Sequence, residues 1–310
     1  MVDVVIPVYR PDNKLHILLN RLIKQSQRPD RIILINTEEQ YFDSEVLDID
    51  PVIEVHHITK EEFDHGATRH MGMELSEAEY VIFMTMDAIP ADRHLIDNLL
   101  KGMKNFGSDG EQIAAAYARQ LPRKNCRMQE KYTRKFNYPE NGRVKTLKDV
   151  EDMGIKAYFL SDVCAIYDRK IYYANGGFRE KMIFNEDMVY GATALEKGYA
   201  IAYCADAKVI HSHNYTCMEQ LRRNFDLGVS HADNADIFDK VPPVSEGKRL
   251  VMETAKFLWD NGRFYEIPYL VCSSAAKYIG YKLGKNYKKL TKNTIMKLTS
   301  NKSYWIDMKE

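Results

Sequence analysis

The sequence predicts an α/β fold, a mostly parallel sheet flanked by helices, followed by a helical C-terminal extension. Short apolar runs alternate with segments of helical periodicity through the first half of the chain, which is typical of a parallel sheet covered on both faces. The 310 residues suffice for one large domain and a smaller appendage. Beyond residue 246 the patterning is helical only. We expect a boundary near residues 241–243, dividing the chain into 1–242 and 243–310.

The predicted elements of the first half follow from their periodicity. Apolar runs predict strands over residues 2–8, 31–35, 52–58, 80–86 and 113–117. Leucines and isoleucines at helical spacing after Pro11 predict a helix near residues 15–23, and further helices are expected over 66–75 and 92–105.

The second half is less regular. Residues 121–150 lose periodicity and become basic, so we expect a surface loop that could act as a lid. Order returns at residues 157–167, with a helix over 187–197 and strands over 200–204 and 208–211. In the extension, Pro268 stands near the start of one helix, and Gly280 and Gly284 are expected to interrupt another.

Charge and composition restrict the partners. The 44 basic and 44 acidic residues balance, which argues against nucleic acid. Residues 274–310, however, hold nine lysines against two acids, which suggests an anionic partner such as membrane lipid. The alternative is that these helices dock on the first domain or on a second copy in a homo-oligomer, with the lysines solvated.

The expected location is cytoplasmic, peripheral at the inner face of the cell membrane. Five cysteines without a CxxC pair indicate free thiols in a reducing compartment. The N-terminal residues lack the pattern of a signal peptide, and the apolar stretch over residues 267–276 is too short to span a bilayer.

Four groups of residues could carry chemistry. Asp87 closes an apolar strand before a turn with Pro90, where a carboxylate can hold Mg²⁺ or Mn²⁺; the alternative is a helix cap. His65, Gly66 and Arg69 stand at an expected helix N-terminus that could bind an anion; the alternative is an ordinary turn.

The other two groups lie in the second half. Glu186 and Asp187 follow the glycine turn at Gly177, and Asp187 could act as a general base, unless both acids only complement the helix dipole. Either histidine of the pair His211 and His213 could ligate a metal. Arg223 offers a cation to phosphate, or else belongs to a solvated helix face.

In this order the motifs resemble family 2 inverting glycosyltransferases, and within them bacterial rhamnosyltransferases of surface-polysaccharide assembly. The resemblance covers roughly residues 2–226. It rests on five stretches of the sequence: VVIPVY at 4–9, DHGATRH at 64–70, TMDAIP at 85–90, GGF and ED between 176 and 187, and HSHNY at 211–215 with RNFD at 223–226.

The resemblance implies a GT-A fold and a role for each motif. Asp187 would be the catalytic base, and Asp87 and His211 would hold Mg²⁺ or Mn²⁺. The implied donor-binding residues are Pro7, Val8, Tyr9, Arg10, Asn36, His65, Gly66, Arg69, Met86, Asp87 and Arg223. The implied acceptor-binding residues are Asp162, Gly177, Phe178 and Glu186.

The implied reaction is transfer of L-rhamnose from dTDP-rhamnose, a nucleotide-sugar donor, to a saccharide acceptor in lipid-linked form. Three positions depart from the family pattern: Asn36 and Met86 stand where many members have acids, and His70 where Asn is usual. Alternatives are a UDP-hexose or UDP-N-acetylhexosamine donor, a metal-independent enzyme, and a non-catalytic nucleotide-sugar-binding scaffold. A nucleotidyltransferase is disfavoured because no glycine-rich loop follows the first strand.

Overall fold

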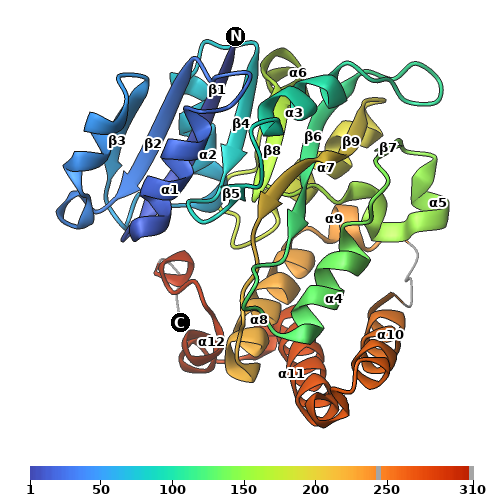
Figure 1. The fold of residues 1–310 in the computed structure, drawn as a ribbon. Helices are drawn as coiled ribbons and strands as arrows, with labels where there is room; N and C mark the ends of the chain where they lie inside the picture. Colours follow the sequence, from blue (N-terminus) through green and yellow to red (C-terminus); the bar gives the residue numbers. More distant parts are fainter. Residues whose placement is uncertain (242–245, 307–310) are drawn as a thin grey trace.

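One mixed sheet of nine strands forms the centre of the molecule (Figure 1). The computed structural model describes residues 1–241 and 246–306. The strands are β1 (Val2–Tyr9), β2 (Arg31–Thr37), β3 (Ile53–Ile58), β4 (Tyr80–Met84), β5 (Ile89–Pro90), β6 (Ile113–Leu121), β7 (Arg143–Lys145), β8 (Cys164–Asp168) and β9 (Ala200–Ile210). The predicted boundary near 241–243 falls partly on residues outside the described ranges.

The helices surround this sheet and continue into the C-terminal region (Figure 1). They are α1 (Asn13–Leu22), α2 (His65–Leu75), α3 (Leu95–Met103), α4 (Met128–Asn137), α5 (Asp149–Met153), α6 (Arg169–Asn175), α7 (Glu186–Glu196), α8 (Cys217–Asp233), α9 (Ala235–Phe238), α10 (Glu246–Asp260), α11 (Ile267–Lys285) and α12 (Lys292–Leu298).

The strand order is β3-β2-β1-β4-β8-β6-β9-β5, with β7 paired to β9. Strands β3, β2, β1 and β4 are parallel, as are β6 and β9, while β8 lies antiparallel between β4 and β6. Because β1, β2 and β4 are parallel, their carboxyl ends meet at one edge of the sheet, and the segments that follow them are brought together there.

Both faces of the sheet are covered, as the alternation predicts. On one face the buried residues Leu15 and Leu18 of α1 and Leu99 of α3 pack with alternate residues of β1 and β4. On the other face, Met73 of α2 and Tyr190 of α7 pack against the opposite set. Successive strand residues point to opposite faces, so each strand contributes to both cores.

The expectation of a surface loop over residues 121–150 is wrong, because this segment contains α4 and β7. Helix α4 is held by α10, which lies far away in the sequence. The ring centroids of Tyr132 and Phe257 are 4.9 Å apart, and the Tyr132 hydroxyl donates to Glu253 at 2.9 Å. A contact with a distant helix produces no apolar periodicity in the local sequence, so the local sequence does not predict α4.

Two other expectations are also corrected. The strands expected over 200–204 and 208–211 form one strand, β9, with a register irregularity opposite Ala118 and Arg119. Helix α11 runs through Gly280 and Gly284 without interruption. A Cβ atom on Gly284 would lie 2.0 Å from the Phe225 carbonyl oxygen of α8, so these glycines permit close helix packing.

In the described part of the chain, no helix combines the length and apolar character needed to cross a bilayer.

Candidate active site

Two adjoining cavities lie beyond the carboxyl ends of β1, β2 and β4. The central cavity has a volume of about 370 Å³ and is lined by Asp87, Asp162, Glu186, Asp187, His211 and His213, among others. The side cavity, of about 280 Å³, is lined by residues that include Tyr9, Thr37, Phe63 and Ser303. His65, Phe184 and Arg223 line both cavities, so the two are neighbouring parts of one cleft.

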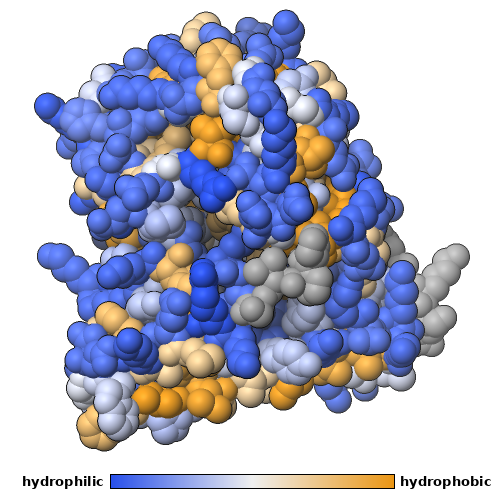
Figure 2. Space-filling model, turned by 90° about the vertical axis from the view of Figure 1, so that its right-hand side faces the viewer, coloured by the Kyte–Doolittle hydropathy of each residue, from blue (hydrophilic) through white to orange (hydrophobic). Residues whose placement is uncertain are grey.

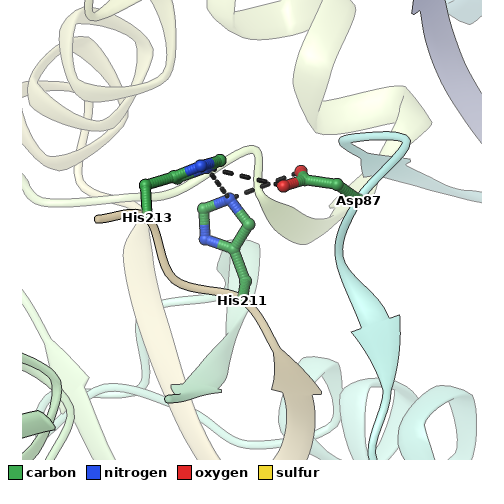
Figure 3. A group of neighbouring side chains, drawn as sticks. All are labelled: Asp87, His211 and His213. Atoms are coloured by element: carbon green, nitrogen blue, oxygen red, sulfur yellow. Dashed lines mark hydrogen bonds and ion pairs between the residues drawn. The ribbon is translucent and has the colours of Figure 1, made fainter. Parts of the chain in front are cut away.

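Asp87, His211 and His213 converge in the central cavity (Figure 3). Asp87 lies in the turn after β4, and the two histidines follow β9. The Nε2 atom of His211 is 3.4 Å from one carboxylate oxygen of Asp87, and that of His213 is 3.5 Å from the other. One ligand atom from each residue lies within 4.8 Å of the others. The turn and the strand end thus bring three metal-ligand types to one point.

The protonation of His211 suits metal binding. Its Nδ1 atom is 3.0 Å from the side-chain oxygen of Gln120, which can only accept, so Nδ1 carries the proton. The Nε2 atom then presents its lone pair toward Asp87 and His213, whose own Nε2 is 3.0 Å away. A second partner that fixes the tautomer is typical of histidine ligands of metals.

The charges of the cluster also fit a cation. Burial and the neighbouring His211 lower the pKa of His213 to about 4, which keeps its imidazole neutral. Burial opposes the charge of Asp87, but the contacts with His211, His213 and Arg123 hold the pKa of Asp87 well below its usual value. One carboxylate and two neutral imidazoles are a donor set for Mn²⁺ or Mg²⁺, and imidazole favours the transition metal.

Arg123 is a further neighbour of Asp87. Its guanidinium donates to the Asp87 carbonyl at 3.0 Å and to the carboxylate at 3.1 Å. This arginine fixes the turn that presents Asp87 and adds a positive charge beside the cluster.

Two carboxylates pair with Arg69 deeper in the cleft. The Arg69 guanidinium pairs with Asp162 at 3.1 Å and with Glu186 at 2.9 Å. The Tyr167 hydroxyl donates to the other oxygen of Asp162 at 2.6 Å. The charge of Arg69 is therefore balanced by acids, although the side chain lines the central cavity where donor phosphates were expected to meet it.

Asp187 lies next to this cluster without an arginine of its own. Its carboxylate accepts hydrogen bonds from the backbone N–H groups of Asp162 at 3.0 Å and Met188 at 2.7 Å. Burial raises the pKa of Asp187 well above its usual value, and the nearby Asp162 and Glu186 raise it further. A carboxylate held by two amides with a raised pKa is suited to accept a proton.

The backbone before Glu186 has an uncommon conformation. Asn185 precedes α7 in the left-handed region, with φ of 66°. It lines the central cavity, and its side-chain nitrogen is buried with no hydrogen-bond partner among the described residues. This turn directs Glu186 and Asp187 toward the cleft.

Arg223 is the free cation between the cavities. Its guanidinium lies 4.8 Å from the ring centroid of Tyr215 and 5.3 Å from that of Phe184, and it forms no ion pair with any described residue. Since Arg223 lines both cavities, it is available to an anionic ligand that spans them.

Several residues expected to bind the donor do not line either cavity. Val8 lies in the core, Pro7 lies in β1, and Met86 packs at the edge of the same core. Arg10 is turned outward, donating to the Tyr41 hydroxyl at 2.8 Å. Asn36 is fully buried, with its side-chain nitrogen 3.0 Å from Nδ1 of His57. Tyr9, which was also expected to bind the donor, lines the side cavity, as does Thr37, the neighbour of Asn36.

The glycines and the phenylalanine that were expected to contact the substrates instead pack within the protein around the cleft. A Cβ atom on Gly66 would lie 2.6 Å from the Arg179 carbonyl oxygen, so this glycine permits close packing of α2. Gly177 has φ of 68° and lies against Tyr172. Phe178 is buried in the core rather than in the cavity, whereas Asp162 and Glu186, also expected to bind the acceptor, line the cavity beside Asp187.

Sequence reasoning missed part of the site. His213 was an open alternative to His211, and both belong to the cluster. Arg123 was recognised only as part of a basic segment. The glutamine that fixes His211 and the residues near 301 gave no local signal, because their roles depend on chain segments far apart in sequence.

The chain is similar to known glycosyltransferases. The family model described as glycosyl transferase family 2 matches residues 3–176. The chain is 36% identical over 306 residues to the O-antigen chain rhamnosyltransferase RfbN of Salmonella typhimurium, covering 98% of this chain and 96% of that protein. It is 35% identical over 284 residues to the O-antigen chain rhamnosyltransferase WbaN of Salmonella anatum, covering 91% and 88%.

Among solved structures, the mannosyltransferase PcManGT from Pyrobaculum calidifontis, in complex with GDP-Man and Mn²⁺, matches with a TM-score of 0.62 at 14% identity, covering 93% of this chain and 88% of that one. TarS of S. aureus (residues 1–349) in complex with UDP matches with a TM-score of 0.51 at 14% identity, covering 93% and 91%. These likenesses confirm the GT-A fold, and with the sequence matches they lead to one conclusion: the chain belongs to glycosyl transferase family 2.

Proposed function

We propose that this chain transfers L-rhamnose from dTDP-rhamnose, with inversion, to a hydroxyl of a growing surface polysaccharide. The observation that carries the proposal is that Asp187 lines the same cavity as the cluster of Asp87, His211 and His213. A base and a cation site can therefore act on the same bound substrate. The rhamnosyltransferase names of the two relatives, which match nearly the whole chain, support the choice of donor sugar.

Asp187 acts as the base in this proposal. Its carboxylate takes the proton from the acceptor hydroxyl while that oxygen forms a bond to the anomeric carbon of the donor. The bond from the anomeric carbon to the phosphate oxygen breaks on the opposite side, and dTDP leaves with the electron pair. Attack opposite the leaving group inverts the configuration.

A divalent cation would be held by Asp87, His211 and His213. When bound, it would supply charge neutralisation for the departing diphosphate. Mn²⁺ suits the two imidazoles better than Mg²⁺. Arg223, free of acidic partners among the described residues, adds a second positive charge between the cavities.

The nucleoside of the donor is proposed to occupy the side cavity. This cavity adjoins the central one through His65, Phe184 and Arg223, so a diphosphate can pass from one to the other. Tyr9 and Phe63 provide aromatic surface, and Thr37 provides a buried hydroxyl. The sugar would then lie in the central cavity near Asp187.

We further propose that the enzyme works at the inner face of the cell membrane on a lipid-linked acceptor. The exposed face of α11 carries an apolar stripe at helical spacing, formed by Val271, Cys272, Ala275, Tyr278 and Ile279, and followed by Lys282.

The exposed aromatic residues Trp259, Phe264 and Tyr265 lie next to this helix in the chain. Figure 2 shows apolar side chains gathered along the lower edge of the molecule, where Figure 1 places α10 and α11. Apolar contact and lysine attraction to anionic lipid would act together.

The substitution Asp187→Asn tests the catalytic role. Loss of the base should lower turnover by roughly 10²- to 10⁴-fold, while the affinity for dTDP stays within about threefold of the wild type. Rhamnosyl transfer is measured with dTDP-rhamnose and a lipid-linked saccharide, and dTDP affinity by calorimetry. Full turnover in the variant would exclude Asp187 as the base. Absence of any transfer by the wild type would favour a non-catalytic scaffold, and transfer from UDP-sugars only would change the assigned donor.

A further inference from the structure

A C-terminal turn, residues 299–303, lies against the side cavity. Ser300, Asn301 and Ser303 line this cavity together with Tyr9 and Thr37, which stand at the ends of β1 and β2. The cavity is thus closed by residues that are almost the whole chain apart.

Asp226 holds the C-terminal turn in place. One carboxylate oxygen accepts from the Thr299 hydroxyl at 2.6 Å, and the other accepts from the Ser300 backbone N–H at 2.8 Å. Asp226 is only 3% exposed and lines the side cavity itself. It stands three residues after Arg223 on α8, so both lie on the same helix face.

The turn is also fixed from its other side. The indole N–H of Trp305 donates to the Thr299 hydroxyl at 3.2 Å. Trp305 is buried in a cluster with Phe225 of α8 and Ile183, which lies a few residues before Asp187. The turn is therefore packed between α8 and the segment that carries the proposed base.

The polar groups at the cavity wall suit a ligand with hydrogen-bonding edges. The Thr37 hydroxyl is buried, 3% exposed, with no hydrogen-bond partner in residues 1–241 and 246–306. The side-chain oxygen of Asn301 accepts from the Ser303 hydroxyl at 2.7 Å and from the Tyr304 N–H at 3.4 Å. These bonds fix the Asn301 amide and leave its NH₂ group as a donor.

We propose that the C-terminal turn is a wall of the nucleoside site and that Asn301 donates a hydrogen bond to the nucleoside of the donor. Asp226 is a positioning residue for this wall. The inference rests on the proposed function, which assigns the nucleoside to the side cavity. A pyrimidine offers carbonyl acceptors to the Asn301 amide and flat faces to the rings of Tyr9 and Phe63.

Calorimetric titration of dTDP in the presence of Mn²⁺ tests this wall. Removing one hydrogen bond in Asn301→Ala should weaken dTDP binding about three- to tenfold. Asp226→Asn, which releases the turn, should weaken it about tenfold or more. Lys302→Ala is the matched control, because Lys302 lies in the same turn, is exposed and does not line the cavity. Its dTDP affinity should equal that of the wild type.

A second measurement separates this role from general destabilisation. Mn²⁺ binding without nucleotide should be the same in wild type and all three variants, since the cluster of Asp87, His211 and His213 lies in the central cavity. If the wild type binds dTDP but Asn301→Ala and Asp226→Asn bind it equally tightly, the C-terminal wall is refuted. If the wild type binds no dTDP, UDP or GDP, the proposed function fails first. Should Asp226→Asn not fold, Asn301→Ala decides alone.

Discussion

The carboxylate of Asp187 occupies a place that disfavours its charge. Burial and the nearby acids Asp162 and Glu186 raise its pKa, while Arg69 is already paired with both of those neighbours. A base needs its ionised form, so a raised pKa means that the base is lost at a higher pH than for an ordinary aspartate. In the proposed mechanism, the arrangement tunes one of these three acids for proton transfer, while the other two hold the arginine.

The pH profile checks this tuning. The acid limb of kcat/KM should lie well above pH 4, the ordinary value for aspartate, and activity should fall as pH decreases through it. Asp162→Asn, which removes one negative neighbour, should shift the limb to lower pH. The profile is recorded at several Mn²⁺ concentrations, so that the titration of Asp187 is distinguished from competition between protons and the metal. An acid limb near pH 4 in the wild type would contradict the raised pKa.

The cluster of Asp87, His211 and His213 predicts that activity depends on a metal. His213→Ala removes a proposed ligand of the metal, and Gln120→Leu removes the partner that fixes His211. We expect the Mn²⁺ concentration for half-maximal activity to rise by about 10- to 100-fold in Gln120→Leu, and by at least as much in His213→Ala. His16→Ala, on α1 and outside both cavities, is the control and should match the wild type. Full activity of His213→Ala in the presence of a chelator would exclude the metal role.

At the residue scale, the sequence predicted the acids and histidines of the site better than their partners. Asp87 and His211 follow strands, and Asp187 follows a glycine turn. The parallel topology indicates at which edge of the sheet such positions lie, and all three residues line the central cavity. Arg69 differs: a helix N-terminus suggested phosphate, but its partners Asp162 and Glu186 come from segments about one hundred residues away. No local pattern specifies such a pairing.

At the element scale, the glycines of α11 show how a local rule can mislead. Gly280 and Gly284 suggested an interrupted helix, yet α8 and α11 approach so closely that a Cβ atom at either position would lie 2.1 or 2.0 Å from a carbonyl oxygen of α8. Helix α4 was missed for a related reason, since its partner α10 begins more than one hundred residues later. The strands of the first half were predicted well because each is a continuous apolar run.

Gly284→Ala tests this packing. The added methyl group meets backbone, so we expect the free energy of unfolding to fall by about 1–3 kcal/mol. Gly247→Ala in α10 is the matched control, because no atom lies within 4 Å of the added group, and helix propensity should leave stability unchanged or raise it by up to about 1 kcal/mol. Both are measured by denaturant unfolding. Equal stability of Gly284→Ala and wild type would mean that the two helices are farther apart.

At the scale of the whole molecule, the C-terminal helices have two opposite faces. The inner face of α11 carries the glycines that pack on α8, and the outer face carries the apolar stripe of Val271, Tyr278 and Ile279. The lysine excess predicted a contact with an anionic surface. The structure shows in addition which side of α11 is exposed. The boundary proposed near 241–243 stays a prediction.

Vesicle binding tests the outer face. The double substitution Val271→Glu and Ile279→Glu should reduce sedimentation with anionic vesicles several-fold, because it places acids within an apolar stripe. Binding of the wild type should weaken as salt screens the lysines. Phe106→Glu is the control, since Phe106 is 62% exposed and follows α3, which Figure 1 places at the opposite end of the molecule from α11. Undiminished, salt-independent sedimentation of the double variant would contradict the proposed membrane role of the apolar stripe.

The side cavity joins Tyr9 to Ser303, and this has a consequence for protein synthesis. The proposed nucleoside site is incomplete until residue 303 has been synthesised and has folded back against the ends of the first two strands. A nascent or prematurely terminated chain would lack this wall and should therefore not sequester activated sugar. The same geometry places residue 1 at the opposite end of β1, so an affinity tag fused before residue 1 would begin away from the proposed donor entrance.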